Sequence, residues 1–393
     1  MSLEPKKTSI LVEVIIFILF ALGPLTGNVI LVLFTVLEAE FSVIPLVAIP
    51  SFMFPFALVQ LFSGAISDVK GRFPVILLGL FVFGIGMIVA SLSFSLTVFA
   101  IANVLAGIGF GFVNPVLIAL LTDITPGPKI SKKIGFLGAV ANLGVGLGPL
   151  LAGIIINFSW RYLYLIFLGI TIFGMVIIFM LRKSQSSTRS EVGIRTLFSH
   201  LALEIRRLPV ILLIISAFLL SHTSIATIIM TSRSFAGEIS ETTSAIIIAF
   251  FGVMGFIAGI LTGFIIKKKG VKPILMMGLI TLFIADFILV LVGNNNIEAI
   301  VYTTIGLVFM GFAGGILITL IMFYSQTLSK ERRGALAGLT TAFQFIGIAL
   351  VPTTLEPFYN SGGMSLVYIV ILVISIVLLV ILIFLHKFAK MIK

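Results

Sequence analysis

The sequence predicts an all-α integral membrane protein with twelve transmembrane helices in two six-helix bundles that are related by an internal repeat. Of its 393 residues, 60% are hydrophobic and only 10% are charged. A soluble protein of this size could not bury so much apolar surface, so the lipid bilayer must be its solvent. The apolar runs are long and do not alternate with polar residues, which favours helices over barrel strands. The third observation is that one polar hairpin occurs at the same place in both halves of the chain.

Twelve apolar stretches reach the length of about 20 residues that a helix needs to cross the hydrocarbon core. They cover residues 10–37, 41–66, 73–95, 97–122, 134–157, 161–181, 209–232, 242–266, 273–293, 298–324, 334–356 and 364–386. A long polar break, residues 182–208, separates a predicted N-terminal bundle (1–181) from a predicted C-terminal bundle (209–393). Within this linker, apolar residues recur at helical spacing and predict an amphipathic helix on the membrane surface. A solvated linker helix without lipid contact is the alternative.

The charges are distributed asymmetrically about this topology. Every lysine and arginine except Arg161 and Arg233 falls on one side, and the opposite loops carry glutamates instead. Because basic loops remain in the cytoplasm, we expect a multi-pass protein of the plasma membrane with both termini cytoplasmic. The net charge of +11 therefore reports topology, and we expect no nucleic-acid partner.

Several chemistries are excluded by composition. The chain has no cysteine, and its three histidines are scattered. Disulfides and thiolate sites are therefore excluded, and a histidine metal cluster is not expected. A P-loop of the form G-x-x-x-x-G-K-[ST] does not occur, so we expect no ATP hydrolysis. We expect no metal, no cofactor and no enzyme activity.

The repeated hairpin is the most informative local feature. Residues Gly64–Pro74 read GAISDVKGRFP, and residues Gly263–Pro273 read GFIIKKKGVKP, 199 positions later. Two glycines and the proline occur in the same register in both copies. A shared hairpin at one place in two hydrophobic halves indicates a duplicated membrane bundle.

The first copy also carries a family pattern. Gly64, Asp68, Gly71 and Arg72 have the spacing of the loop between the second and third helices of the major facilitator superfamily, which the chain resembles. In that family the loop gates the cytoplasmic side, and an acid at the end of the fourth helix supports it. Asp123 stands at that place. The resemblance therefore implies a gating loop made by these five residues.

The fifth predicted span is rich in glycine and resembles the antiporter motif of the drug:proton antiporters within the superfamily. The eighth span offers a second row of glycines. In the family these two helices meet across the halves, which implies an interdomain seam along which the bundles rock. The predicted seam residues are Gly144, Gly148, Pro149, Gly153, Gly255, Gly259 and Gly263. Ordinary helix packing through small residues is the alternative.

The chain also departs from the family pattern. Phe73 stands where a second basic residue is common in the hairpin. Asn103 stands where the family usually has arginine, and Asn28 where related drug exporters often place an aspartate. Losing both charges together is physically coherent, because losing one would leave a charge unpaired in hydrocarbon. Proton coupling would then need another group.

A few polar residues within the spans are further candidates for substrate binding or coupling. They are Asn28, Asn103, His222, Thr223, Thr227, Asp286 and Gln344. His222 lies deep in the seventh span, where a group that titrates near neutrality is a functional candidate. A neutral histidine bonded to a neighbouring carbonyl is the alternative, and a structural hydrogen bond is favoured for Asp286.

Together these features predict a monomeric secondary active transporter that works by alternating access between the two bundles. The sparse polar residues favour export of small apolar or weakly polar solutes, as in multidrug exporters, and leave proton coupling open. The expected partners are a small-molecule substrate, the lipid bilayer and, where coupling exists, protons. A passive facilitator or importer of a small metabolite is the first alternative. A membrane enzyme or a non-transporting receptor is less favoured, because the chain offers neither convergent acid–base groups nor large extensions.

Overall fold

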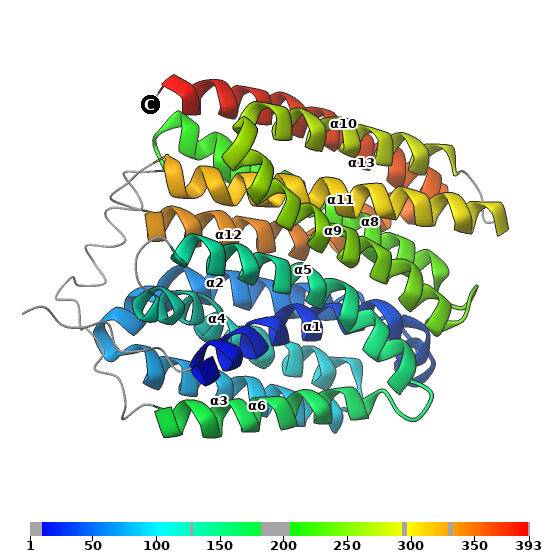
Figure 1. Ribbon diagram of the computed structural model, residues 1–393. Coiled ribbons are helices and arrows are strands. Elements are labelled where there is room, and N and C mark those ends of the chain that lie inside the picture. Colours follow the sequence, from blue (N-terminus) through cyan, green and yellow to red (C-terminus); the bar gives the residue numbers. More distant parts are fainter. Residues whose placement is uncertain (1–9, 126–128, 182–204, 293–296, 329–332, 392–393) are drawn as a thin grey trace, which may run out of the picture.

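The computed structural model describes residues 10–125, 129–181, 205–292, 297–328 and 333–391, and these residues are almost entirely helical. Figure 1 shows long helices running side by side along one axis. The helices of the N-terminal half lie together in the lower part of this view, and those of the C-terminal half lie above them. This arrangement agrees with two helical bundles.

Six helices form the N-terminal half. They are α1 (Ile10–Phe41), α2 (Ala48–Lys70), α3 (Arg72–Ser91), α4 (Leu96–Ile124), α5 (Lys129–Ile155) and α6 (Arg161–Leu181). The second helix begins seven residues later than predicted because α1 continues to Phe41 and residues 42–47 form the turn. Ser42 adopts a positive φ of 61° in this turn.

The C-terminal half is built from the remaining helices. They are α8 (Leu208–Phe235), α9 (Glu241–Lys269), α10 (Val271–Leu291), α11 (Ile297–Thr327), α12 (Arg333–Ala349) and α13 (Val351–Met391). Residues 182–204, where most of the predicted amphipathic helix falls, lie outside the described residues. The described part of the chain resumes at Ile205, and α8 follows with Pro209 in its first turn, where the missing N–H removes no helical bond.

Eleven apolar helical pieces are long enough to span a membrane in the described parts of the chain, and the last, Leu336–Ala389, has 54 residues. That piece contains two spans, because Gly363 leaves the helical region with φ 64° and ψ −161°. The chain therefore has the twelve-helix architecture that the sequence predicts. The eleventh span was predicted as one helix over 334–356, but it breaks at Leu350 between α12 and α13. Pro352 has no N–H to donate to the preceding turn, which accounts for the break.

The two copies of the repeated hairpin share one backbone geometry. Gly71 and Gly270 have φ values of 95° and 78°, in a region that favours glycine. The Gly71 N–H donates to the Ser67 carbonyl at 2.9 Å, and the Gly270 N–H donates to the Ile266 carbonyl at 3.0 Å. Donors and acceptors are thus both 199 positions apart, so the internal repeat is visible in the backbone as well as in the sequence.

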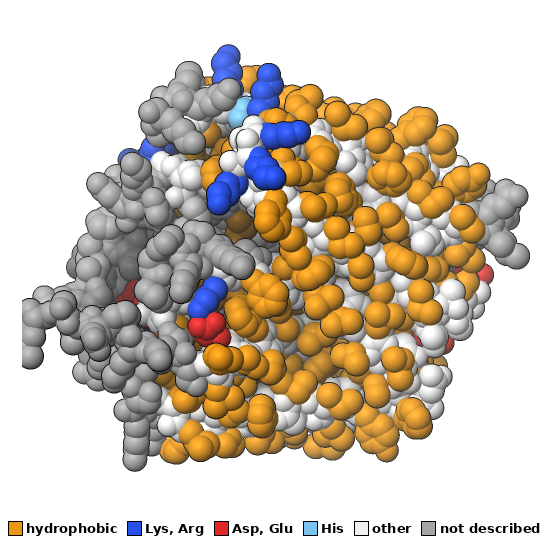
Figure 2. Space-filling model, viewed as in Figure 1, with side chains coloured by type: hydrophobic (Ala, Val, Ile, Leu, Met, Phe, Trp, Pro, Cys, Tyr) orange, Lys and Arg blue, Asp and Glu red, His pale blue; other side chains and the backbone are white. Residues whose placement is uncertain are grey.

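The sides of the molecule are apolar. Figure 2 shows hydrophobic side chains over most of the visible lateral face, with charged side chains gathered toward its ends. Exposed examples from both halves are Leu78, Phe81, Phe173, Ile280 and Phe283. A surface of this kind is stable only against acyl chains, so it marks the membrane-embedded belt.

Candidate transport pathway and its two ends

The helix bundle has two opposite ends, and we call them the Arg72 end and the Glu40 end after one residue at each. At the Arg72 end, the α2–α3 hairpin lies beside the end of α4, and the starts of α1 and α5 come together. At the Glu40 end, the end of α1 lies beside the α3–α4 turn and the start of α6.

Arg72 is the centre of a polar network at its end. Its Nε donates to Asp123 Oδ2 at 3.0 Å, its Nη1 donates to Ser67 Oγ at 2.6 Å, and it forms an ion pair with Asp68. Ser67 Oγ in turn donates to the Gly64 carbonyl at 2.6 Å. The structure thus brings together all five residues of the predicted gating loop, and the planar guanidinium makes several directed contacts at once.

A second ion pair at the same end was not predicted. Lys133 of α5 pairs with Glu13 of α1, and each side chain is about one-quarter exposed. Phe17 and Phe136 lie one turn further along these helices, with ring centroids 4.9 Å apart. The spacing of charges along the sequence offers no signal for this pair, because the partners are 120 residues apart.

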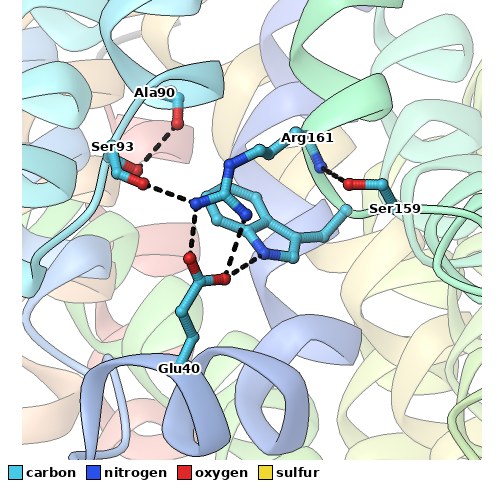
Figure 3. A network of polar contacts seen from close by, with 6 residues as sticks. Glu40, Ala90, Ser93, Ser159 and Arg161 are labelled. Carbon is cyan, nitrogen blue, oxygen red and sulfur yellow. Dashed lines mark hydrogen bonds and ion pairs between the residues drawn. The ribbon is translucent and has the colours of Figure 1, made fainter.

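The Glu40 end of the N-terminal half is fastened by a charged cluster (Figure 3). The Arg161 guanidinium donates to both carboxylate oxygens of Glu40, and its Nη1 lies 3.1 Å from Oε2. Its Nη2 also donates to the Ser93 carbonyl at 2.8 Å. Trp160 Nε1 donates to Glu40 Oε2 at 2.7 Å. The Arg161 guanidinium lies 4.4 Å from the centroid of the Trp160 ring. This cluster ties α1, the α3–α4 turn and α6 together.

The C-terminal half has a comparable cluster. Arg233, near the end of α8, lies 3.4 Å from Glu356 Oε1 and has its guanidinium 4.9 Å from the centroid of the Tyr359 ring. Tyr359 is 199 positions after Trp160, the same offset as in the hairpins. Arg233, like Arg161 an exception to the one-sided distribution of basic residues, therefore joins helices within its own half.

Helices α5 and α9 pack backbone against backbone. A Cβ at Gly252 would lie 2.3 Å from the Gly146 nitrogen, and a Cβ at Gly146 would lie 3.1 Å from the Ala249 carbonyl oxygen. Further along, a Cβ at Gly153 would lie 2.7 Å from the Ala245 Cβ. Only glycine permits such an approach.

The predicted seam residues do not all lie at this contact. Gly144 and Gly148 face α1 instead, since a Cβ at Gly148 would lie 2.6 Å from the Leu25 carbonyl oxygen. Residues two apart on a helix point about 160° away from each other, so Gly146 faces α9 when its neighbours face α1. Pro149 is buried, and α5 continues through it to Ile155.

The predicted glycines of α9 also differ in how closely they approach neighbouring helices. A Cβ at Gly255 would lie 3.3 Å from Asn142 Oδ1 of α5. At Gly259 it would meet Thr319 of α11 at 3.6 Å and Asn142 at 3.8 Å. At Gly263 no described atom lies within 4 Å of a Cβ. The close contact between α5 and α9 thus fades toward the Arg72 end.

Hydrogen bonds between the halves lie at the Glu40 end. Gly237 N–H donates to Thr35 Oγ1 at 3.2 Å, and Thr242 Oγ1 donates to the Gly153 carbonyl at 3.0 Å. Ser232 of α8 donates to the Leu31 carbonyl of α1. On the other side of the interface, the Phe56 ring of α2 packs against the Phe345 ring of α12, with centroids 4.3 Å apart. This end is closed by neutral groups.

At the Arg72 end, the interface helices α2, α5, α9 and α12 leave an opening among the described residues. Gly64 of α2, Gly138 of α5, Gly263 of α9 and Gly338 of α12 all lie toward this end. No described atom lies within 4 Å of a Cβ at any of the four. Among the described residues, the halves are therefore in contact at the Glu40 end and separated at the Arg72 end.

Several predicted polar residues bond to their own helices. Asn28 Nδ2 donates to the Pro24 carbonyl at 2.7 Å, and Asn103 Nδ2 donates to the Phe99 carbonyl at 2.8 Å. Thr223 and Thr227 likewise donate to carbonyls one turn earlier in α8. These contacts satisfy the polar groups locally and leave the interior only weakly polar.

His222 is buried at the break in the eleventh span. Its Nδ1 lies 2.8 Å from the Gly347 carbonyl oxygen of α12, and its Nε2 lies 3.3 Å from Thr354 Oγ1 of α13. A carbonyl can only accept, so Nδ1 carries a hydrogen. The Phe218 ring stacks on the imidazole at 5.9 Å. His222 therefore joins α8 to both sides of the break.

Several buried polar groups have no hydrogen bond of normal geometry among the described residues, and two of the predicted candidates are among them. Asp286 of α10 is 1% exposed, and its carboxylate faces Ser375 of α13. The Nε2 atoms of Gln60 in α2 and Gln344 in α12 also have no partner in the described residues. These two glutamines flank the Phe56–Phe345 contact, at the boundary between the closed and open parts of the interface. No group of three His, Asp or Glu side chains suited to a metal occurs in the described residues.

Comparison with known proteins agrees with this architecture. The model of the Major Facilitator Superfamily matches residues 12–352. The quinolone resistance protein NorA of Staphylococcus aureus (strain COL) is 27% identical over 337 residues, which cover 81% of this chain and 84% of that protein. Multidrug resistance protein 2 of Bacillus subtilis (strain 168) is 25% identical over 307 residues, or 74% of this chain and 75% of that protein.

A solved structure shares the fold. The crystal structure of a D-xylose-proton symporter superposes with a TM-score of 0.77 over 95% of this chain and 97% of that one, at 14% identity. At this identity the match concerns the fold alone. With the family match over most of the chain, the twelve-helix architecture and the repeated hairpin, these findings give one conclusion: the chain is a membrane transporter and belongs to the Major Facilitator Superfamily.

Proposed function

We propose that this transporter exports small apolar or weakly polar solutes by alternating access, and that protons drive the export. The observation that carries the proposal is the asymmetry of the interface between the halves. Glycines of α5 and α9 are in backbone contact at the Glu40 end, whereas at interface glycines of the Arg72 end no described atom lies within 4 Å of a Cβ. Such an arrangement suits two bundles that rock about a central site.

The charges support an assignment of the open end to the cytoplasm. The Arg72 end carries most of the basic residues, so the positive-inside rule assigns it to the cytoplasm. The conformation would then be open to the cytoplasm, the state in which an exporter takes up its substrate. The basic distribution over the whole chain supports cytoplasmic termini in the same way.

The interior chemistry favours weakly polar substrates. Asn28 and Asn103 each donate to a carbonyl of their own helix. The Nε2 atoms of Gln60 and Gln344, without a partner among the described residues, belong to the two helices whose phenylalanine rings pack together. A site of this composition would hold an aromatic or aliphatic body and offer few directed hydrogen bonds. Two relatives are named for quinolone and multidrug resistance, and this supports the proposal because export of a drug would confer resistance to it.

His222 is our first candidate for proton coupling. Its two partners are a carbonyl oxygen and a hydroxyl oxygen, and both can accept a hydrogen bond. The Thr354 hydroxyl donates to the Leu350 carbonyl at 2.8 Å. While it does so, a doubly protonated ring could donate to both partners, whereas a neutral ring donates from Nδ1 alone. Gain of a proton would tighten the link between α8 and the start of α13. Asp286 is the second candidate, because it is the other titratable side chain that lies deep in the described spans of this half.

Transport in proteoliposomes tests the proposal. The purified chain should move apolar dyes against their gradient when a pH gradient is imposed, and the His222→Ala variant should lose this pH dependence. Asp286→Asn is the parallel variant. A passive facilitator is the alternative, and the asparagines at positions 28 and 103 favour it because they cannot carry a proton. Dye movement that stops at equal concentrations and ignores the pH gradient would establish that alternative.

A further inference from the structure

The C-terminal half carries an unusual concentration of lysine at the Arg72 end. Lys267, Lys268 and Lys269 close α9, Lys272 lies in the first turn of α10, and all four are exposed. Arg206 and Lys387, beside the start of α8 and near the end of α13, are exposed at the same end. Figure 2 shows blue side chains gathered in this region of the surface.

The internal repeat shows that this cluster is a departure from the other half. At the 199-residue offset, Asp68 corresponds to Lys267, and Phe73 corresponds to Lys272. In the N-terminal half Arg72 is paired with two carboxylates, but its counterpart in the C-terminal half is the apolar Val271. The described part of the C-terminal half has no Asp or Glu at this end, since its acids lie at the Glu40 end or at mid-depth. The positive charge is therefore uncompensated by the described residues.

Two of the lysines lie at the Arg72 end of exposed rows of apolar side chains, which we call stripes. On α9, Lys268 follows Phe264 by four residues, and Phe264 is 65% exposed. On α10, Lys272, Met276 and Ile280 recur at four-residue spacing, with the two apolar side chains 46% and 56% exposed. Residues four apart lie on one face of a helix. The α9 stripe faces away from the glycine contact with α5, so both stripes belong to the lipid-facing belt.

This arrangement matches an amphiphile with an anionic head. We propose that the α9–α10 hairpin binds an anionic phospholipid of the adjoining leaflet, with the headgroup phosphate on Lys268 and Lys272. Its acyl chains lie along the stripes that Phe264 and Ile280 help to form. Lys267 and Lys269, which flank these stripes, add attraction without direct contact. Juxtamembrane lysines attract anionic headgroups in this way, and the attraction weakens as salt screens it.

The test compares two double variants of the full-length protein in nanodiscs that contain phosphatidylglycerol and phosphatidylcholine. Lys268→Gln/Lys272→Gln removes the two lysines at the ends of the stripes, and Lys267→Gln/Lys269→Gln removes the same amount of charge from the same hairpin. Each headgroup contact is expected to contribute about five-fold in affinity. The first variant should therefore retain about 25-fold less phosphatidylglycerol than the unmodified protein by native mass spectrometry, and the second should lose far less.

Thermal unfolding supplies a second readout. Added phosphatidylglycerol should raise the melting temperature of the unmodified protein and of the Lys267→Gln/Lys269→Gln variant, but not that of the Lys268→Gln/Lys272→Gln variant. Equal melting in pure phosphatidylcholine shows that the variants fold. Equal lipid loss in both double variants would overturn the site, because the attraction would then be diffuse. Equal stabilisation by inorganic phosphate would also overturn it, because the ligand would then be a free anion. The measurement needs no transport and so does not depend on the proposed function.

Discussion

Single glycines decide how closely the two halves approach. At the α5–α9 contact, a Cβ on Gly252 would lie 2.3 Å from the backbone nitrogen of Gly146, far inside van der Waals contact. Backbone atoms cannot move aside as a flexible side chain can. Gly263 lies on the same helix, three turns away, with no described atom within 4 Å of a Cβ. An added methyl group would therefore clash at Gly252 but would meet no described atom at Gly263.

We predict that Gly252→Ala opens the seam and that Gly263→Ala does not. Overpacking of this kind costs about 1–3 kcal/mol, which would populate the separated arrangement at the Glu40 end and lower the transport rate. Thermal unfolding and dye transport should be compared for the two variants, with Gly263→Ala as the matched control. Normal transport by Gly252→Ala would show that the close contact has no part in the cycle.

Arg72 shows the same dependence on one residue type. Its guanidinium contacts Asp68, Asp123 and Ser67 together. We predict that Arg72→Lys slows transport and loses about 1 kcal/mol of stability, because an ammonium cannot match this planar set of contacts. Lys70→Gln, two residues away and exposed, should behave like the unmodified protein. Transport rates of the two variants in proteoliposomes provide the comparison.

Sequence could identify the members of the Arg72 network but not the orientation of the glycines. The spacing of Asp68, Gly71 and Arg72 is local, and the structure brings these residues to Asp123 as expected. In α5, glycines at 144, 146 and 148 alternate between opposite faces. The choice of face toward α9 depends on the rotation of the whole helix against its neighbours, which the sequence of α5 does not encode alone.

Among the elements, the eleventh span is the one whose course differs most from prediction. His222 binds the Gly347 carbonyl at the end of α12 and reaches Thr354 at the start of α13. We predict that His222→Ala costs about 1–3 kcal/mol in thermal unfolding, because it leaves that carbonyl buried without a donor. Thr354→Val removes the 3.3 Å contact with His222 and the hydroxyl's own bond to the Leu350 carbonyl, but it should cost less because the Gly347 carbonyl keeps its donor. If both variants melt like the unmodified protein, His222 does not hold the break together.

The clusters at the Glu40 end fasten the helices within each half. Arg161 combines a two-point grip on Glu40 with a bond to the Ser93 carbonyl and a contact with Trp160. We predict that Arg161→Lys lowers the free energy of unfolding by about 1–2 kcal/mol, because lysine cannot make the two-point contact and the pair is only partly exposed. Arg233→Lys should cost less, because Arg233 has one carboxylate contact at 3.4 Å. Equal losses in thermal unfolding would contradict this ranking.

Most elements were predictable because hydrophobic length determines a membrane helix almost alone. The sixth span, for example, was predicted over 161–181, and α6 covers these residues. The break at Leu350 is explained by Pro352, but membrane helices also tolerate proline without breaking, so the residue alone does not predict it. The Glu13–Lys133 pair could not be foreseen, because it depends on how α1 and α5 are placed side by side.

For the whole molecule, the open and closed ends give a direct prediction. The chain has no cysteine, so single cysteines report their own surroundings without background. We predict that cysteine at Gly138 or Gly263 reacts with a membrane-impermeant maleimide from the Arg72 end, whereas cysteine at Gly146 does not. Preferential labelling at Gly146 would mean that the predominant conformation in the membrane is open at the Glu40 end instead.

The sequence predicts the two-bundle architecture because the duplication and the twelve apolar stretches are both written along the chain. It does not predict which end is open. Two conformations of an alternating-access transporter differ by a few kcal/mol and share nearly all contacts within each bundle. Residues such as Gly138 and Gly146 look alike in sequence, and only the placement of the halves separates them.

Every ion pair between described residues, from Glu13–Lys133 to Arg233–Glu356, joins helices of the same half, whereas the halves meet through glycine backbones, hydroxyls and rings. Parting the bundles at the Glu40 end therefore ruptures no charge pair that the described residues form. Each neutral bond contributes only about 1 kcal/mol net. The first movement toward a state open at the Glu40 end should consequently proceed at much the same rate in dilute and concentrated electrolyte.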